Sequence, residues 1–130
     1  MSHLTRRRVA VVLAVMLGGW LLFDGARALL LGNYVTQATG PYAGQLGPWA
    51  TLLNSMGLPP RSRAAILLHL ATGLLWMIVA AVPSHRRLRS AVVATIVGLW
   101  YLPFGPVIGL ACCALLAGTR PGSGSTGSVR

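Results

Sequence analysis

The stretch VAVVLAVMLGGWLLFDGARALLL, residues 9–31, decides the fold class of this 130-residue chain. Two further apolar runs follow it, at 64–82 and 91–117. A transmembrane helix needs about 20 predominantly apolar residues, because each residue advances about 1.5 Å through a hydrocarbon core about 30 Å thick. All three runs reach this length, so the sequence predicts an all-α integral membrane protein with three transmembrane helices.

The composition excludes an ordinary soluble domain. Hydrophobic residues make up 55% of the chain and charged residues 9%, whereas soluble domains carry about 25% charged residues. The net charge of +10 comes from 11 arginines that lie mostly in short flanks of the apolar runs. Such placement is typical of the positive-inside rule and of contacts with anionic headgroups, so we expect the lipid bilayer, and not nucleic acid, as the partner.

The arginines also predict an orientation. With three spans, the compact clusters at 6–8 and 86–89 lie on one side and directly flank the spans, where the positive-inside rule acts most strongly. Four arginines lie on the opposite side: Arg61, Arg63, Arg120 and Arg130. We therefore expect residues 1–8 to form a basic cytoplasmic head, the loop after the first span to be external, and the C-terminus to lie outside.

The first run has an alternative interpretation as a cleaved signal peptide. The segment TRRRV, residues 5–9, is similar to a twin-arginine export signal, and ARA, residues 26–28, has the small-x-small form of a cleavage site. Against this, the apolar run continues past the cut through residues 29–31. We therefore expect a retained span.

The connection 32–63 contains one short helix, predicted over 48–56. Pro48 suits a first helical position and Gly57 suits a C-terminal stop. One face of this helix carries apolar side chains at helical spacing: Trp49, Leu52, Leu53 and Met56. It is too short to span, so we expect it to lie in the external membrane interface. The alternative is a lid packed on the tops of the other helices.

Within the third run, Pro103 and Pro106 each lack a backbone donor, which predicts a kink near 102–105. A re-entrant break at the same place is the alternative. We expect residues 9–118 to form a single membrane domain. The Gly/Ser-rich tail, 119–130, is predicted to be disordered.

Small residues are spaced for close helix packing. They recur every four residues on the first and third runs: Ala10, Ala14, Gly18, Gly105, Gly109 and Cys113. Three tryptophans lie well inside the runs, and we expect each to pack between helices with a partner for its indole N–H: Trp20, Trp76 and Trp100.

Four polar side chains are candidates for a site within the spans. Asp24 and Arg27 are three residues apart and share a helix face. Counted from the cytoplasmic side, Asp24 and His69 both lie roughly 20 Å deep, and Tyr101 lies about one turn nearer to that side. Intramembrane ionisable residues are functional candidates, so the cluster could relay a proton or bind a small polar ligand.

The alternative is that Asp24 and Arg27 neutralise each other while His69 hydrogen-bonds Asp24 or a backbone carbonyl. Deeper in the runs only Thr72 and Thr95 are polar, and each hydroxyl can satisfy a backbone carbonyl. This scarcity of polar groups favours the second interpretation.

The sequence indicates no metal, no cofactor and no enzymatic activity. It contains no Cys/His spacing typical of zinc, and a chain with one carboxylate cannot perform two-carboxylate chemistry. We expect a structural or accessory protein that packs against another membrane protein or a second copy of itself. The alternative is a small transporter or proton-coupled binding protein that uses the Asp24, Arg27 and His69 cluster; a membrane enzyme acting over the external loop is the third.

Four segments carry a resemblance to known proteins: FDGARAL (23–29), GNYVT (32–36), YAGQLGPW (42–49) and LWYLPFGP (99–106). Together they resemble a group of small bacterial integral membrane proteins of uncharacterised activity. The YAGQLGPW segment is the most distinctive. The resemblance implies a location in the bacterial cell (inner) membrane and implies no activity for any residue.

Overall fold

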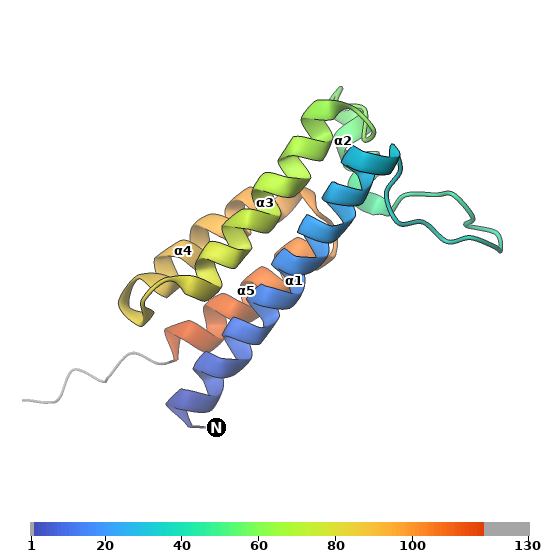
Figure 1. The fold of residues 1–130 in the computed structure, drawn as a ribbon. Helices are drawn as coiled ribbons and strands as arrows, with labels where there is room; N and C mark the ends of the chain where they lie inside the picture. Colours follow the sequence, from blue (N-terminus) through green and yellow to red (C-terminus); the bar gives the residue numbers. More distant parts are fainter. Residues whose placement is uncertain (1, 119–130) are drawn as a thin grey trace, which may run out of the picture.

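The computed structural model describes residues 2–118 and is all-α, as predicted from the sequence (Figure 1). The predicted disorder of 119–130 lies outside the described residues. The elements follow one another in this order: α1 (His3–Leu31), α2 (Pro48–Ser55), α3 (Arg63–Ala81), α4 (Ser84–Val97), the 3-10 turn η1 (Gly98–Trp100) and α5 (Phe104–Ala117).

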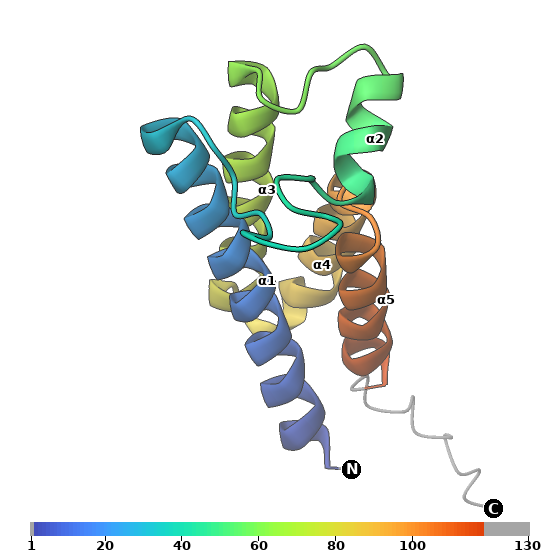
Figure 2. The same cartoon turned by 90° about the vertical axis from the view of Figure 1, so that its right-hand side faces the viewer.

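The two longest helices, α1 and α3, run side by side along the molecule (Figures 1 and 2). With 29 and 19 residues, they are about 43 and 28 Å long. The side chains of Ser2 and Ser62 cap their N-termini. Both helices are long and apolar enough to cross a membrane.

A reciprocal glycine contact brings α1 and α3 together. A methyl group added at Gly18 would come within 2.9 Å of the carbonyl oxygen of Gly73. One added at Gly73 would come within 2.9 Å of the backbone nitrogen of Leu22. The backbones are therefore too close for any side chain at either position, which is the geometry expected where small residues mediate helix packing.

The predicted single third span is wrong, because run 91–117 is broken into two helices. The chain turns at residues 101–103, where the Leu102–Pro103 peptide is cis, and α5 packs back against α4 (Figure 2). Pro103 and Pro106 offer no backbone donors, so an α-helix cannot continue through them undisturbed. Each arm has 14 residues and is about 21 Å long, which is shorter than a membrane span.

This α4–α5 hairpin returns the chain to the end at which it began. The guanidinium of Arg6 donates a hydrogen bond to the carbonyl of Gly118 (3.3 Å), and Cys112 Sγ donates to the carbonyl of Ala10 (3.6 Å). Residue 118 therefore lies beside the first turns of α1. The expected position of the end of the third run, opposite the α1 N-terminus, does not fit this arrangement, because the break after Trp100 reverses the chain.

The predicted short helix is present as α2, which lies above the tip of the hairpin (Figure 2). Its buried residues are Trp49, Ala50 and Leu53, whereas Met56 is 70% exposed. Because the buried side chains face the other helices, the arrangement favours the lid over a helix that turns its apolar face toward the membrane interface. The turn after α2 is completed by Gly57, whose φ is +79°.

The predicted packing residues lie at two different seams. Ala10, Ala14 and Gly18 are buried on α1. Gly105 and Gly109 lie inside the hairpin, where a methyl group at Gly109 would come within 2.5 Å of Thr95 Oγ1. Cys113 Sγ lies 3.7 Å from the same Thr95 oxygen. Gly105 and Gly109 therefore allow α4 and α5 to pack closely within the molecule.

The three tryptophans differ from one another. Trp76 is fully buried, and its indole N–H has no hydrogen-bond partner among the described residues. Trp100 is buried and donates to Thr72 Oγ1 (3.3 Å). Trp20 donates to the Tyr101 hydroxyl (3.0 Å) but is 45% exposed. The expectation of burial between helices is wrong for Trp20, because it lies on the outward side of α1.

Large apolar side chains remain exposed along every long element. Examples are Val12, Met16, Phe23, Leu67, Leu74, Ile96, Phe104, Val107 and Leu110. Where such side chains form a contiguous surface, they mark a site for a protein partner or a membrane.

Candidate functional site

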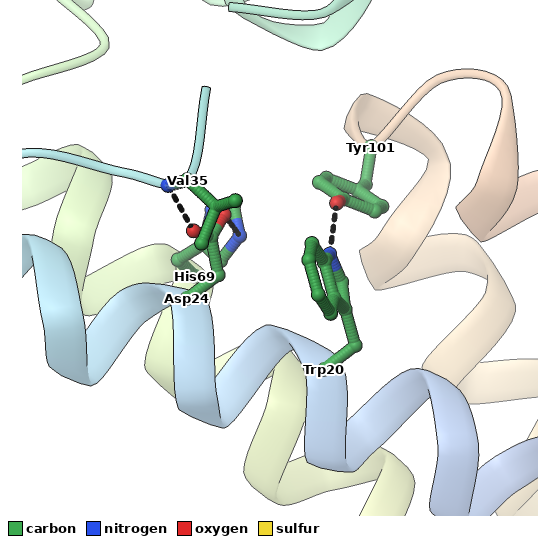
Figure 3. A network of polar contacts seen from close by, with 5 residues as sticks. All are labelled: Trp20, Asp24, Val35, His69 and Tyr101. Atoms are coloured by element: carbon green, nitrogen blue, oxygen red, sulfur yellow. Dashed lines mark hydrogen bonds and ion pairs between the residues drawn. The ribbon is translucent and has the colours of Figure 1, made fainter. Parts of the chain in front are cut away.

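The centre of the candidate site is the pair Asp24 and His69, which α1 and α3 place opposite each other (Figure 3). His69 Nε2 lies 3.6 Å from Asp24 Oδ2. The other carboxylate oxygen, Asp24 Oδ1, accepts a hydrogen bond from the backbone N–H of Val35 (2.6 Å). His69 is completely buried and Asp24 is 4% exposed. The fold therefore removes the only carboxylate of the chain from solvent and sets it beside an imidazole.

Four aromatic rings enclose His69. Their centroids lie 5.1–5.2 Å from that of the imidazole, and they belong to Tyr34, Trp49, Trp100 and Tyr101. Each ring comes from a different part of the chain: the loop after α1, α2, η1 and the hairpin tip. The site is thus assembled where the broken helix, the lid and the two long helices meet.

Several buried polar atoms of the candidate residues and of the rings around His69 lack a hydrogen-bond partner among the described residues. They are His69 Nδ1, His69 Nε2, the Tyr34 hydroxyl and Arg27 Nε. Buried polar groups are nearly always hydrogen-bonded, so unpartnered ones call for a specific explanation. Burial, with a contribution from the Asp24 carboxylate, raises the pKa of Tyr34 to about 12. The phenol is therefore neutral at physiological pH and can donate a hydrogen bond.

The structure brings three of the four sequence-predicted polar residues together. Asp24, His69 and Tyr101 meet, with the Tyr101 ring against the imidazole and its hydroxyl hydrogen-bonded to Trp20 (Figure 3). Arg27 lies one turn further along α1 and, within the described chain, makes no ion pair with Asp24. The geometry therefore does not contain the expected neutralising contact between these two charges.

The two threonines deeper in the molecule have backbone partners, as predicted. Thr72 Oγ1 donates to the carbonyl of Leu68 (2.8 Å), and Thr95 Oγ1 donates to that of Ala91 (2.7 Å). Thr72 also accepts the indole N–H of Trp100. Both hydroxyls thus have structural roles.

A groove of about 730 Å³ leads from the molecular surface to Asp24. It lies between α1 and the hairpin tip, beneath the loop and the first residues of α2. Its walls are mostly apolar and include Met16, Trp20, Phe23, Leu102, Phe104 and Ile108. Its volume falls in the range of small-molecule sites, about 300–1,000 Å³.

Sequence reasoning missed Tyr34 and Val35 as parts of the site. Both lie in a loop without periodicity, where no local signal shows that the chain folds back over Asp24. Trp100 is predicted to pack between helices and Trp49 to lie on the apolar face of the short helix, but their shared contact with His69 depends on the break in the third run. No group of three or more metal-ligating side chains gathers within residues 2–118.

The described residues form an all-α protein with two helices long and apolar enough to cross a membrane. The pair Asp24 and His69 is enclosed beside the tip of the α4–α5 hairpin. Comparison of the chain with protein-family models, curated proteins and solved structures found no match.

Proposed function

We propose that this chain is a multi-pass membrane protein that crosses the bilayer through α1 and α3 and inserts α4–α5 as a re-entrant hairpin. The lengths of α1 and α3 support the two spans. The exposed apolar side chains on α1, α3, α4 and α5 support contact with lipid. An arm of about 21 Å reaches only part of the way across a hydrocarbon core of about 30 Å.

Non-helical backbone at membrane depth is tolerated where it is buried in protein or lines a cavity. At the hairpin tip Trp100 and Tyr101 are buried, whereas Leu102 and Phe104 are exposed and line the groove. Trp100 ties the tip to α3 through Thr72, and Tyr101 ties it to α1 through Trp20. Trp49 of the lid packs on both tip aromatics. Backbone groups of the turn bond one another, with Gly105 N–H donating to the Tyr101 carbonyl (2.8 Å).

The arginines support the proposed orientation. Six of them lie at the end that holds the α1 N-terminus and the α3–α4 turn: Arg6, Arg7, Arg8, Arg86, Arg87 and Arg89. Arg61 and Arg63 lie at the opposite end. By the positive-inside rule the six-arginine end faces the cytoplasm. A bacterial inner membrane fits this orientation and the resemblance noted above.

Within this framework we propose a non-enzymatic binding function for the groove. The observation that carries it is the course of the groove, which starts on the outward apolar face and reaches Asp24, the residue that contacts His69. Of the functions expected from the sequence, the binding protein is therefore the one that the geometry favours. The ligand would enter sideways from the bilayer with its polar group toward Asp24.

Filling the groove tests this function. Gly19 lines it, and a Cβ added there meets no atom within 4 Å, so Gly19→Phe places a ring in the groove without a backbone clash. Native mass spectrometry of the protein purified in mild detergent is expected to show a bound small molecule in the wild type and in Gly19→Ala. The same adduct should be absent from Gly19→Phe. Retention of the adduct in Gly19→Phe, or no adduct in any form, would contradict the proposal.

An accessory role remains a second proposal, supported by the breadth of the exposed apolar surface on α1 and α5. Such a surface fits helices of another membrane protein as well as lipid. Cross-linking in the native membrane followed by purification tests it. A partner or a second copy linked through α1 or α5 is the expected result, and a strict monomer without partner would contradict it.

A further inference from the structure

We infer that the groove takes a lipophilic cation: an amine or quaternary ammonium group that carries an apolar chain. This inference rests on the proposed binding function and adds the chemical class of the ligand. Three features carry it: the charge at the inner end of the groove, the aromatic rings around that end, and the apolar walls that lead outward.

Asp24 is the one acidic or basic side chain among the described residues that line the groove. Asp24 is the only acidic residue in the chain, and it lines this groove. Among the described residues, the groove lining contains no arginine, although the chain has eleven. Arg27, the nearest arginine on α1, interacts electrostatically with Asp24, but within the described chain it forms no ion pair with it and does not line the groove. A ligand ammonium would therefore meet a buried carboxylate without a competing ion pair from an arginine.

The rings at this end suit a cation. Trp20, Trp49 and Tyr101 all line the groove. Trp49 and Tyr101 lie side by side, with centroids 6.0 Å apart and planes inclined by 34°. Indole and phenol faces attract ammonium groups, most strongly where water is excluded. The same rings offer no such attraction to an anion.

The outer walls of the groove suit an apolar chain. Met16, Phe23 and Phe104 line it and are themselves more than half exposed on the outward face. In the proposed orientation this face meets lipid tails, so a single-chain amphiphile can leave its tail in the groove and keep its head at Asp24. A neutral head would use only hydrogen bonds to groups such as Asp24, and an anionic head would be repelled by the carboxylate.

Three amphiphiles of equal chain length test the inference: dodecyltrimethylammonium, dodecanol and dodecanoate. Each is titrated into the protein in lipid nanodiscs, and binding is followed by tryptophan fluorescence, because Trp20 and Trp49 line the groove. We expect the cation to bind at least about tenfold more tightly than the neutral or anionic compound. Gly19→Phe should abolish binding of all three.

Asp24→Asn is the matched variant, because asparagine keeps an oxygen that can accept the Val35 N–H. It should weaken binding of the cation by about tenfold and leave dodecanol unchanged. Equal binding of all three compounds to the wild type would overturn the cation inference even if Asp24→Asn failed to fold, and would leave the proposed groove function standing. If none of the three bound to the wild type, the groove function and the inference would both fail.

Discussion

At the scale of single residues, the site combines strong enclosure with unused hydrogen-bonding capacity. His69 is fully buried among four rings, yet neither ring nitrogen has a hydrogen-bond partner among the described residues. Tyr34 is nearly as buried, and its hydroxyl is also unpartnered. A core residue selected only for packing would be apolar, since buried unpartnered polar atoms cost free energy. Neither residue is among those that line the groove, so the binding role rests on Asp24, which lines it and contacts His69.

Replacing His69 separates packing from polarity. His69→Ala leaves a cavity between four rings and is expected to lower the free energy of unfolding by about 2–4 kcal/mol. His69→Phe keeps a ring and removes the unpartnered nitrogens, so it should cost much less or even stabilise the protein. Thermal unfolding in detergent measures both. Equal destabilisation by the two variants would show that polar contacts of the imidazole hold the fold.

Tyr34 makes stability depend on pH in the alkaline range. Its pKa is about 12 in the folded protein against an ordinary value of 10.0, so between these values the unfolded chain loses the phenolic proton first. Stability is therefore intact below pH 10 and is lost as the pH rises toward 12. Tyr34→Phe should reduce this loss, measured as the unfolding midpoint between pH 9 and 12. Tyr42→Phe at an exposed position is the control, and an identical loss in all three proteins would refute the assignment.

At the scale of elements, the contacts between helices depend on glycines at a few positions. Gly18 and Gly73 face a neighbouring backbone, whereas Gly19 faces open space. The hairpin depends on similar closeness at Gly109, beside Thr95. Because packed backbones cannot easily move apart, an added methyl group should act very differently at these positions.

Three alanine substitutions test this difference. Gly18→Ala and Gly73→Ala should each destabilise the protein by about 1–3 kcal/mol, because the added methyl group forces α1 and α3 apart. Gly19→Ala should be neutral or stabilise it by up to about 1 kcal/mol, because alanine favours the helix. Denaturant titration of the three variants measures the effect. A Gly73→Ala protein as stable as Gly19→Ala would contradict the close packing of α1 and α3.

Local sequence patterns could predict α1, α3 and the short α2. The two long helices follow from the length of their apolar runs, and α2 follows from the spacing of its apolar residues and from the signals at its ends. It could not predict that run 91–117 folds back. A proline pair is compatible with a kinked span or with a break, and the choice depends on distant partners such as Thr72 and Trp20 that hold the tip. The pairing of Asp24 with His69 could be anticipated from depth, whereas the covering loop that brings Tyr34 over them could not.

At the scale of the whole molecule, the hairpin determines how the site relates to the membrane in the proposed arrangement. Because α4 is about 21 Å long, its tip stops at the level of Asp24 and His69 rather than on the far side. The lid then closes over the tip, and the groove opens sideways between α1 and α5. A continuous third span would carry the chain past this level and leave no tip for α2 to cover.

The central claim is that run 91–117 enters and leaves the bilayer on one side. Single cysteines at the exposed positions His3, Gln37 and Ala117, in a background with Cys112 and Cys113 replaced by alanine, test it with a membrane-impermeant maleimide on intact cells. We predict that Gln37→Cys reacts from outside, and that His3→Cys and Ala117→Cys react only after the membrane is disrupted. Reaction of Ala117→Cys in intact cells, with His3→Cys protected, would show a third complete span and contradict the re-entrant hairpin.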